Sequence, residues 1–352
     1  MVRNVKIGDC GEYCWVIDGY KFDLKDAVQQ VLRRNKKRII LEAPQGFIKN
    51  LKKISELLES RLNNKVEIHL RLEPAYGACS LSTELIDENT FLIHIGHDEY
   101  PYPIHGVKQA KGNYYLIAAE YIETDVEKMI SSMIDIITNM NYSKLAIGYT
   151  TQHKTTAIEV GNFLLNEGFT VQKVVGVTGC FYYNLIKYKE SVDAYFVIAG
   201  GAFHGLGLSL ALNGRKPVFV ADPYTYNIRS LEDLFKKILA KRYWFMYRAL
   251  EGKHVGIIDG LLAGQCRPPI SRFLSVIARK HGFKPRIILA RYVNKEFLDN
   301  LGPSDFDFFV TVSCPRLAIE DLSDYWKPVL TPAEARLVFR KNITEGEYTF
   351  PW

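Results

Sequence analysis

Hydrophobic runs separated by glycine-rich or polar turns occur in the same order three times along the chain. The first run of each copy is rich in Ile, Leu and Val, which favour strands, and an amphipathic pattern typical of a helix follows it. The first runs are "KRIILEAPQG" at 37–46, "KLAIGYTT" at 144–151 and "KHVGIIDG" at 253–260. The helical patterns are "LKKISELLESRL" at 51–62, "TTAIEVGNFLLNEG" at 155–168 and "SRFLSVIARKHG" at 271–282. The sequence therefore predicts strands and helices that alternate in three similar copies.

A later strand-like run completes each copy. These runs are "FLIHIGHD" at 91–98, "DAYFVIAGG" at 193–201 and "DFFVTVSC" at 307–314. Strands that alternate with helices imply parallel sheets with helices on their faces. We therefore expect an α/β fold made of three pseudo-repeated small α/β sandwich domains with mainly parallel sheets. The expected domains are 1–120, 121–227 and 228–352.

Three cysteines follow strand-like runs, one in each copy. Cys79 ends "EIHLRLEPAYGAC", Cys180 ends "VQKVVGVTGC" and Cys314 ends "DFFVTVSC". The carboxyl ends of parallel strands are where open α/β sheets form their sites. One such cysteine would be an ordinary buried residue, but three at these points favour a metal site shared by the three domains. The symmetry is imperfect, because Cys314 follows the third strand of its copy while the other two follow the second.

Thiolate chemistry narrows the choice of metal. Soft sulfur ligands suit zinc and iron–sulfur clusters. Structural zinc normally takes four protein ligands, often from local Cys-x2–4-Cys pairs, and these three cysteines form no such pair. Three cysteines on a [4Fe–4S] cluster leave one iron open to a substrate or cofactor, so a catalytic cluster is the stronger hypothesis.

The other three cysteines carry less information. Cys10 and Cys14 have the Cys-x3-Cys spacing found in the usual radical S-adenosylmethionine signature, but the third cysteine of that signature is missing, so we interpret the pair as incidental. Cys266, in "GLLAGQCRPP", is open to three interpretations: a fourth ligand, a redox-sensitive neighbour or a packed thiol, and we favour the packed thiol. All six cysteines are expected to be thiols or metal ligands before disulfides.

Composition and charge limit the class of protein. The chain of 352 residues is 47% hydrophobic and 24% charged, as in globular proteins, and its net charge of +6 does not require nucleic acid as a partner. The longest apolar stretch, at 195–212, is interrupted by glycines, so we expect a strand, a turn and a helix there, not a membrane span. The N-terminus has no apolar signal segment, and we expect a cytoplasmic protein. His94, His97 and His204 are interpreted as satisfied polar residues.

Several longer motifs resemble one known family. They are "EPAYGAC", "IGHDEYP", "GVTGCF", "GGAFHGLGLSLALNGRKPVFVADPY", "GLLAGQCR" and "SCPRLAIEDLSDYWKPVLTPAEA". In this order and spacing they resemble the diphthamide-synthesis 3-amino-3-carboxypropyl transferases, and the single-subunit archaeal form is closest in length. The resemblance covers roughly 37–336, and the Cys-Pro-Arg-Leu segment is its most specific part.

The resemblance implies an atypical radical enzyme, usually a homodimer. In that family the cysteines that match Cys79, Cys180 and Cys314 hold a [4Fe–4S] cluster, and S-adenosylmethionine binds beside its open iron. One electron from the reduced cluster, which needs an electron donor, breaks the bond between sulfur and the methionine γ-carbon. The resulting 3-amino-3-carboxypropyl radical adds to a histidine of translation elongation factor 2, and methylthioadenosine is released.

The same resemblance implies which residues contact S-adenosylmethionine. The motif matches are Gly200, Gly201, His204, Gln265 and Arg316. Arg316 is suited to bind the methionine carboxylate through two hydrogen bonds. A salt bridge from Arg316 to an acidic residue one turn further on, Glu320 or Asp321, is an equal alternative.

Departures from the family pattern motivate competing hypotheses. Ser80–Thr83 replace residues that are usually acidic, Ala263 stands where Lys is common, and Cys266 stands where a basic or polar residue is usual. A noncatalytic partner subunit that keeps the cluster would tolerate such changes. A quinolinate-synthase-like [4Fe–4S] dehydratase also takes one cysteine from each of three repeats, and a zinc-stabilised α/β protein is the simplest alternative.

Overall fold

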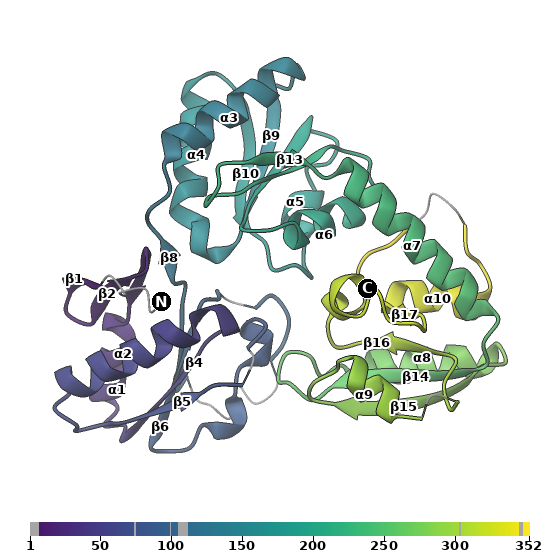
Figure 1. The fold of residues 1–352 in the computed structure, drawn as a ribbon, viewed down its shortest axis with the longest axis horizontal. Coiled ribbons are helices and arrows are strands. Elements are labelled where there is room, and N and C mark those ends of the chain that lie inside the picture. Colours follow the sequence, from purple (N-terminus) through teal and green to yellow (C-terminus); the bar gives the residue numbers. More distant parts are fainter. Residues whose placement is uncertain (1–6, 74, 99, 105–111, 303, 345–347) are drawn as a thin grey trace, which may run out of the picture. The chain divides into compact units, whose positions relative to one another are not determined.

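The computed structural model describes residues 7–73, 75–98, 100–104, 112–302, 304–344 and 348–352. The chain forms two compact units. The first unit comprises 1–126, 150–156 and 262–264, and the second comprises 127–149, 157–261 and 265–352. Each unit is described by itself below, and the elements are labelled in Figure 1. Among the described residues, no helix is both long and apolar enough to cross a membrane.

A parallel sheet and an antiparallel sheet make up the first unit. The parallel sheet has the order β5-β4-β6-β7, with β4 Arg38–Glu42, β5 Glu67–Arg71, β6 Thr90–Ile95 and β7 Tyr114–Ile117. The antiparallel sheet has the order β1-β2-β3-β8, with β1 Ile7–Gly11, β2 Cys14–Ile17, β3 Tyr20–Asp23 and β8 Glu120–Tyr121. The helices are α1 Lys25–Arg33 and α2 Ile48–Arg61, and the 3-10 turns are Gln45–Phe47, Ala78–Ser80, Thr83–Leu85 and Thr151–His153.

The two faces of the parallel sheet in the first unit are covered differently. Residues of β4 alternate between the faces, so Ile39 and Leu41 pack in a cluster with α1 and α2. Ile40 points to the other face, where it clusters with Leu92 of β6 and with Leu81 from the segment that carries Cys79. The Cys79 segment is therefore held against the second face of the sheet.

Two further sheets make up the second unit. One has the order β10-β9-β11-β12-β13, and only β13 is antiparallel to its neighbour. Its strands are β9 Lys144–Tyr149, β10 Thr170–Gly176, β11 Ala194–Ile198, β12 Val218–Ala221 and β13 Ile228–Ser230. The other is fully parallel, with the order β15-β14-β16-β17, and its strands are β14 His254–Gly260, β15 Lys284–Ala290, β16 Phe308–Thr311 and β17 Val329–Leu330.

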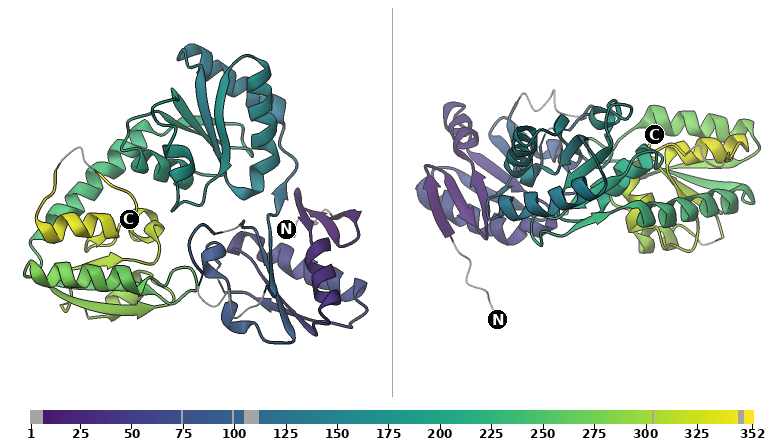
Figure 2. Two further views of the ribbon diagram at one scale, coloured as in Figure 1. Left: turned by 180° about the vertical axis from the view of Figure 1, so that it is seen from behind. Right: turned by 90° about the horizontal axis from the view of Figure 1, so that it is seen from above.

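Helices cover the sheets of the second unit. They are α3 Val126–Asn139, α4 Lys154–Asn166, α5 Tyr183–Ile186, α6 Phe203–Ala211, α7 Glu232–Leu250, α8 Pro268–Lys280, α9 Lys295–Asn300 and α10 Pro332–Arg340, with a π-helical turn at Leu317–Asp321. Along β16, Phe308 and Val310 pack towards α8 and α10, whereas Phe309 packs towards α9 and the π-helical turn. Figure 2 shows α8 and α10 along the sheet. Burial on both faces explains the almost continuous hydrophobic run in this strand.

The predicted fold class is confirmed. The strands expected at 37–46, 144–151 and 253–260 are β4, β9 and β14, and the helices expected after them are α2, α4 and α8. In all three parallel sheets the first strand lies between the second and the third, so their strand order is the same. The apolar stretch at 195–212 forms β11, a turn and α6, as expected. The division into three domains stays a prediction.

The expectation that all six cysteines are free thiols or metal ligands was wrong for one pair. Cys10 and Cys14 form a disulfide, with a Cα–Cα distance of 5.1 Å. The antiparallel pairing of β1 with β2 folds the chain back between them and places their backbones within bridging range. Cys79, Cys180, Cys266 and Cys314 are free.

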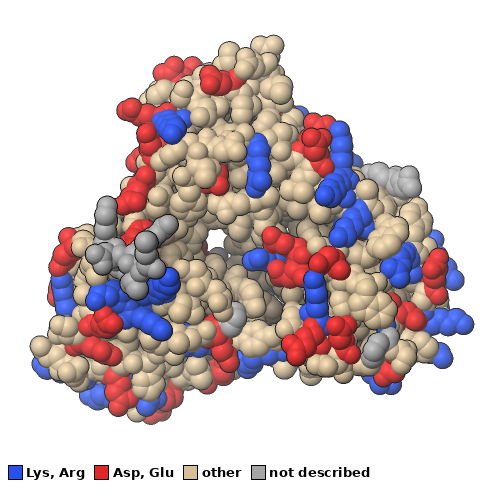
Figure 3. Space-filling view, in the orientation of Figure 1, with Lys and Arg blue, Asp and Glu red and all other residues tan. Residues whose placement is uncertain are grey.

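Charged side chains of both signs lie on the surface. On the described part of the face drawn in Figure 3, Lys and Arg side chains are interspersed with Asp and Glu side chains. Most ion pairs of this kind are exposed, such as Lys236–Glu232 on α7, and contribute little to stability.

One ion pair in the second unit is fully buried. Arg242 of α7 donates from Nε to Glu334 Oε1 of α10 at 2.8 Å, from Nη1 to the Ala318 carbonyl at 2.8 Å and from Nη2 to the Val329 carbonyl at 2.6 Å. The Tyr348 hydroxyl also donates to Glu334, at 2.6 Å. The pair therefore joins α7, β17, α10 and the π-helical turn that follows Cys314.

We expect Glu334→Gln to destabilise the protein by about 3–5 kcal/mol at pH 7, because it leaves the buried Arg242 charge uncompensated. Urea unfolding followed by circular dichroism measures this change. The matched control is Glu232→Gln, which removes an exposed ion pair of α7 and should leave the unfolding midpoint unchanged. Equal midpoints for the two variants would contradict the structural role of the buried pair.

Candidate functional site

Two of the three predicted metal ligands lie in the second unit, after strands of different sheets. Cys180 follows β10 and is 9% exposed, and its Sγ lies 3.7 Å from the Thr178 hydroxyl. Cys314 follows β16 and is partly exposed. The Cys314 carbonyl accepts a hydrogen bond from Leu317 N at 3.2 Å, which starts the π-helical turn. Both cysteines thus follow the carboxyl ends of parallel strands, as predicted.

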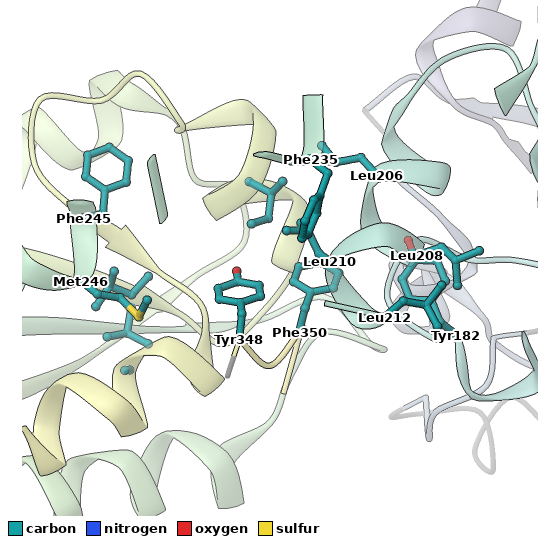
Figure 4. Close-up of a cluster of buried hydrophobic side chains, with 14 of the residues drawn as sticks. Tyr182, Leu206, Leu208, Leu210, Leu212, Phe235, Phe245, Met246, Tyr348 and Phe350 are labelled. Atoms are coloured by element: carbon teal, nitrogen blue, oxygen red, sulfur yellow. The ribbon is translucent and has the colours of Figure 1, made fainter. Parts of the chain in front are cut away.

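Tyr182 lies two residues after Cys180, is 3% exposed and belongs to the cluster of buried side chains drawn in Figure 4. Burial raises the pKa of its phenol well above the usual value, and Cys180 and Cys314 act in the same direction.

Cys79 belongs to the first unit. The predicted strand before it is shorter than expected, because β5 ends at Arg71 and Cys79 lies on the 3-10 turn Ala78–Ser80. The neighbouring strand β4 leads into Pro44, which has no N–H for a sheet hydrogen bond, so the pairing stops. Ser80 stabilises the turn by donating to the Gly77 carbonyl at 2.7 Å and accepting from Tyr76 N at 3.1 Å. Ser80, one of the departures from the family pattern, thus has a structural role.

Gly264 holds the Cys79 backbone in place. Its N–H donates to the Cys79 carbonyl at 2.7 Å. A Cβ at this position would lie 2.6 Å from Cys79 Cα and 2.9 Å from the Tyr100 ring. Only glycine allows this close approach, so Gly264 is needed where the Cys79 turn meets the segment after β6.

A buried polar network, which the sequence did not indicate, anchors the same turn. Glu42, at the end of β4, is fully buried and accepts from the Ser82 hydroxyl at 2.6 Å. Arg71 Nη1 donates to the same oxygen at 3.3 Å. His94 Nδ1 lies 2.8 Å from the other carboxylate oxygen, and its Nε2 lies 2.8 Å from His97 Nδ1. The sequence signal for this network is a lone Glu at the end of an otherwise apolar strand.

The ionised form of Glu42 fixes the direction of these hydrogen bonds. Burial alone would raise its pKa, but His94, Ser82 and Arg71 together hold the pKa below its usual value. Because the carboxylate accepts, His94 donates to it from Nδ1. The prediction that His94 is a satisfied polar residue is correct, and its partners are Glu42 and His97.

Gln265 of the Gly-Gln segment belongs to the second unit and lies near the residue before Cys314. A Cβ on Gly260 would lie 2.7 Å from the Gln265 carbonyl oxygen and 2.9 Å from Ser313 Cβ, so the absence of a side chain at Gly260 leaves room for both residues. Arg267 holds the segment in place, since its N–H donates to Asp259 at 2.8 Å and its guanidinium donates to the Ser313 carbonyl. Gln265 is 5% exposed.

Cys266 is a partly buried free thiol in this segment. Burial, and secondarily Asp259, raise its pKa, while Arg267 opposes the rise. A raised pKa reduces the thiolate fraction at neutral pH and so disfavours a reactive thiol. The packed-thiol role of Cys266 stays a prediction.

The glycines and His204 of the predicted S-adenosylmethionine site lie around the turn from β11 to α6. Gly201 has a φ of +135° and open space at its Cβ position, whereas a Cβ on Gly200 would lie 2.4 Å from the Tyr224 ring. Burial, and then the charge of Arg316, lower the pKa of His204 to about 4. His204 therefore carries a neutral imidazole at pH 7.

Arg316 lies in the same region of the second unit. Its guanidinium carbon lies 5.5 Å from the centre of the Phe203 ring, next to His204. Its Nε lies 2.9 Å from Glu320 Oε2 and 3.3 Å from Asp321 Oδ1, so the salt bridge one turn further on is present. Burial raises the pKa of Asp321, and Arg316 opposes that rise. Its predicted contact with S-adenosylmethionine stays a prediction.

Within either compact unit, no three described Cys, His, Asp or Glu side chains lie close enough together to hold a metal ion. Cys79 belongs to the first unit, and Cys180 and Cys314 belong to the second. The assignment of these three cysteines as ligands stays a prediction. Cys180, Cys314, Gly200, Gly201, His204, Gln265 and Arg316 all belong to the second unit.

We expect Glu42→Gln to cost about 3 kcal/mol at pH 7, because Arg71 loses its buried countercharge. The folded-state pKa of Glu42 lies below the ordinary value of 4.5, so its ionised form stabilises the fold above that pH. The stabilisation is lost as the pH falls through the folded-state pKa. Urea unfolding at pH 7 and at pH 3.5 should therefore show a smaller difference between variant and wild type at the lower pH. A difference independent of pH would rule out the ionised network.

We expect Gly264→Ala to displace the Cys79 turn at a cost of about 1–3 kcal/mol, because its methyl group would overlap the Cys79 backbone. Labelling with a thiol reagent and mass spectrometry measure how fast Cys79 reacts. Gly46→Ala is the matched control in the first unit, since a Cβ there meets nothing within 4 Å. If Cys79 reacts at the wild-type rate in both variants, the close contact is absent in solution.

Proteins of known identity resemble this chain over nearly its whole length. The 2-(3-amino-3-carboxypropyl)histidine synthase of Pyrococcus horikoshii is 27% identical over 325 residues, which cover 89% of each chain. Subunit 1 of the Saccharomyces cerevisiae synthase is 27% identical over 350 residues, covering 94% of this chain and 78% of the relative. The crystal structure of Dph2 from Pyrococcus horikoshii with a 4Fe-4S cluster has a TM-score of 0.79 and 26% identity, and covers 94% of this chain and 93% of that one.

A family model also matches the chain over most of its length. The family model "Putative diphthamide synthesis protein" matches residues 20–349. This range includes all three parallel sheets and all four free cysteines. The chain belongs to the diphthamide synthesis protein family.

Proposed function

We propose that this chain is a 2-(3-amino-3-carboxypropyl)histidine synthase. It transfers the 3-amino-3-carboxypropyl group of S-adenosylmethionine to a histidine of translation elongation factor 2, the first step of diphthamide biosynthesis. The observation that carries the proposal is the position of Cys180 and Cys314 after the carboxyl ends of β10 and β16, in the same unit as His204, Gln265 and Arg316. Relatives named for this activity are similar over 88–89% of this chain.

The donor set fits a [4Fe–4S] cluster. Cys79, Cys180 and Cys314 are free thiols, and three thiolates leave one iron for an external ligand. The structural neighbour from Pyrococcus horikoshii carries such a cluster. When bound, the cluster supplies the single electron that breaks the bond between sulfur and the γ-carbon of S-adenosylmethionine.

The chain's own residues bind and orient S-adenosylmethionine. Arg316 pairs with the methionine carboxylate, in exchange for part of its contact with Glu320 and Asp321. The imidazole of His204 is neutral at pH 7 and so does not repel the sulfonium cation. The turn at Gly200 and Gly201 lets the backbone approach the ligand closely.

Other residues hold the site together and limit water. Gln265 is buried and packs against Gly260, in the segment that Arg267 ties to the Ser313 carbonyl. Buried apolar side chains such as Leu206 and Val177 surround the region after β10 and β11. Exclusion of water protects a carbon radical from side reactions and strengthens the electrostatic contacts.

Partners follow from this activity. The protein substrate is elongation factor 2, and an external reductant supplies the electron. We infer that the chain works in the cytoplasm as a homodimer without a direct contact to nucleic acid. Some relatives are named as the synthase and others as its subunit 1, so a noncatalytic partner subunit is the second candidate. The quinolinate-synthase-like dehydratase and the zinc protein have less support, because these relatives are named 2-(3-amino-3-carboxypropyl)histidine synthase.

Anaerobic reconstitution tests the proposal. We expect about four irons and four sulfides per chain, and release of methylthioadenosine with dithionite and S-adenosylmethionine. Cys314→Ala should lose both iron and methylthioadenosine formation, whereas the matched control Cys266→Ala should keep both. Mass spectrometry of elongation factor 2 identifies the modified histidine. A colourless protein with zinc, or a full cluster without methylthioadenosine, would overturn the proposal, and a requirement for a second homologous chain would favour the partner-subunit reading.

A further inference from the structure

A chain of hydrogen bonds runs outward from the buried Glu42 of the first unit. His94 Nδ1 lies 2.8 Å from Glu42 Oε1, and His94 Nε2 lies 2.8 Å from His97 Nδ1. Glu42 and His94 are both 0% exposed, whereas His97 is partly exposed. The chain therefore joins a buried carboxylate to an imidazole that lies at the surface of the unit.

The turn after β6 sets the two imidazoles against each other. Gly96 has a φ of +93°, a conformation that favours glycine, and its N–H donates to the Ile117 carbonyl at 2.6 Å. The rings of His94 and His97, on either side of this turn, have centres 5.1 Å apart. Gln152 donates to the Gly96 carbonyl at 2.6 Å and so holds the turn in place. The backbone thus fixes the geometry of the pair.

The partly exposed end of this chain lies on the segment that contacts the Cys79 turn. The ring of Tyr100, three residues after His97, and the Cβ of Cys79 each lie 2.9 Å from the position that a Cβ on Gly264 would take. The carboxylate at the other end is tied to the same turn by the Ser82 hydroxyl. Cys79 is a cluster ligand in the proposed function. His97 therefore belongs to the loops at the carboxyl edge of the sheet, where α/β folds form their sites.

The bond between the two imidazoles allows two arrangements that differ by one proton. In the first, both rings are neutral, and His97 donates from Nδ1 to His94 Nε2. In the second, His94 is an imidazolium that donates to His97 Nδ1, and His97 carries its proton on Nε2. When a proton arrives at His97 Nε2, the proton on Nδ1 passes to His94 and the heavy atoms stay in place. The pair is therefore built to take up a proton.

The neighbouring charges supply a countercharge for such a proton. Arg71 lies 3.3 Å from Glu42 through Nη1 and 2.9 Å from Glu73 through Nη2. Two carboxylates and one guanidinium leave one negative charge in excess. A positive charge on His94, next to the Glu42 carboxylate, neutralises that excess. Asp98 is the other acidic group on the histidine segment, and because it is exposed its charge is screened by solvent.

We propose that His97 accepts the proton that leaves the target histidine of elongation factor 2 during transfer, and that His94 and Glu42 pass on and neutralise its charge. The inference rests on the proposed function. It makes His97 a catalytic residue and His94 and Glu42 positioning residues.

The chemistry of the transfer requires such an acceptor. Addition of the carbon radical forms a carbon–carbon bond at a ring carbon that still carries its hydrogen. To restore the aromatic ring, the carbon–hydrogen bond breaks and its bonding electrons rejoin the π system. The proton goes to His97 Nε2, and the one surplus electron goes to a one-electron acceptor, the oxidised iron–sulfur cluster. Removal of the proton by a positioned base makes this step fast.

His97→Asn tests the assignment, because asparagine keeps an N–H donor for His94 but cannot take up a proton. The matched control is His69→Asn, which replaces an exposed histidine of the same unit. Each protein is reconstituted anaerobically and incubated with dithionite, S-adenosylmethionine and elongation factor 2. Methylthioadenosine and modified elongation factor 2 are then both counted per chain, so that their ratio separates cleavage of S-adenosylmethionine from transfer.

We expect His97→Asn to release methylthioadenosine as the wild type does, but to form about a hundredfold less modified elongation factor 2 per methylthioadenosine, since a positioned base contributes on the order of 10²–10⁴-fold. Deuterium on the reacting carbon of the target histidine should slow transfer more in this variant than in the wild type, because loss of that hydrogen then limits the rate. His69→Asn should match the wild type in both measurements.

A chemical modification keeps the inference testable if the variant does not fold. Diethyl pyrocarbonate carbethoxylates accessible imidazoles, and mass spectrometry identifies which histidines of the wild-type chain it has modified. After removal of the reagent, loss of transfer should follow carbethoxylation of His97, while release of methylthioadenosine continues.

The possible failures are distinguishable. A wild-type protein that releases no methylthioadenosine contradicts the proposed function itself. A wild-type ratio of the two products in His97→Asn, or in the chain carbethoxylated at His97, overturns the inference while the synthase assignment stands. An equal loss of both products, or an isotope effect no larger than that of the wild type, also overturns it, since His97 would then only support the fold.

Discussion

A carboxylate buried at the end of an interior strand is the constraint on which the site depends. Glu42 ends β4 and Asp259 lies near the end of β14, and each strand lies in the interior of its parallel sheet. A buried carboxylate must find donors, and each of these finds them in or next to a loop that carries site residues. Ser82 holds the Cys79 segment on Glu42, while the Arg267 N–H and the Ser271 hydroxyl hold the Gln265 segment on Asp259. These two loops are thus fixed by hydrogen bonds to a buried carboxylate as well as by packing.

The hydrophobic pattern was sufficient to predict the sheets, but not the hydrogen bonds that Glu42 and Asp259 accept. The hydrophobic run at 253–260 was correctly predicted to be a strand, because both faces of β14 are buried. The partners of Glu42 come from residues 71, 82 and 94, and no local spacing indicates such a contact. For the same reason the sequence predicted that three cysteines follow strands, but not that the Gly264 N–H donates to the Cys79 carbonyl. The Cys10–Cys14 disulfide depends on the fold of a hairpin that the period-two pattern was too short to reveal.

The sequence suggested two contacts for Arg316, a salt bridge to an acidic residue one turn further on and a contact with a ligand carboxylate, and the observed salt bridge is compatible with both. Its salt bridge to Glu320 and Asp321 lies on the partly exposed π-helical turn, where such pairs are weak. A weak pair can be exchanged for a ligand carboxylate at small cost, and it keeps the guanidinium extended until then. The buried Arg242–Glu334 pair has the opposite role, since it fixes the carbonyls of Ala318 and Val329 around that turn. A turn that buried hydrogen bonds hold rigid, and that carries an arginine whose salt bridge can be exchanged, is suited to binding a charged substrate.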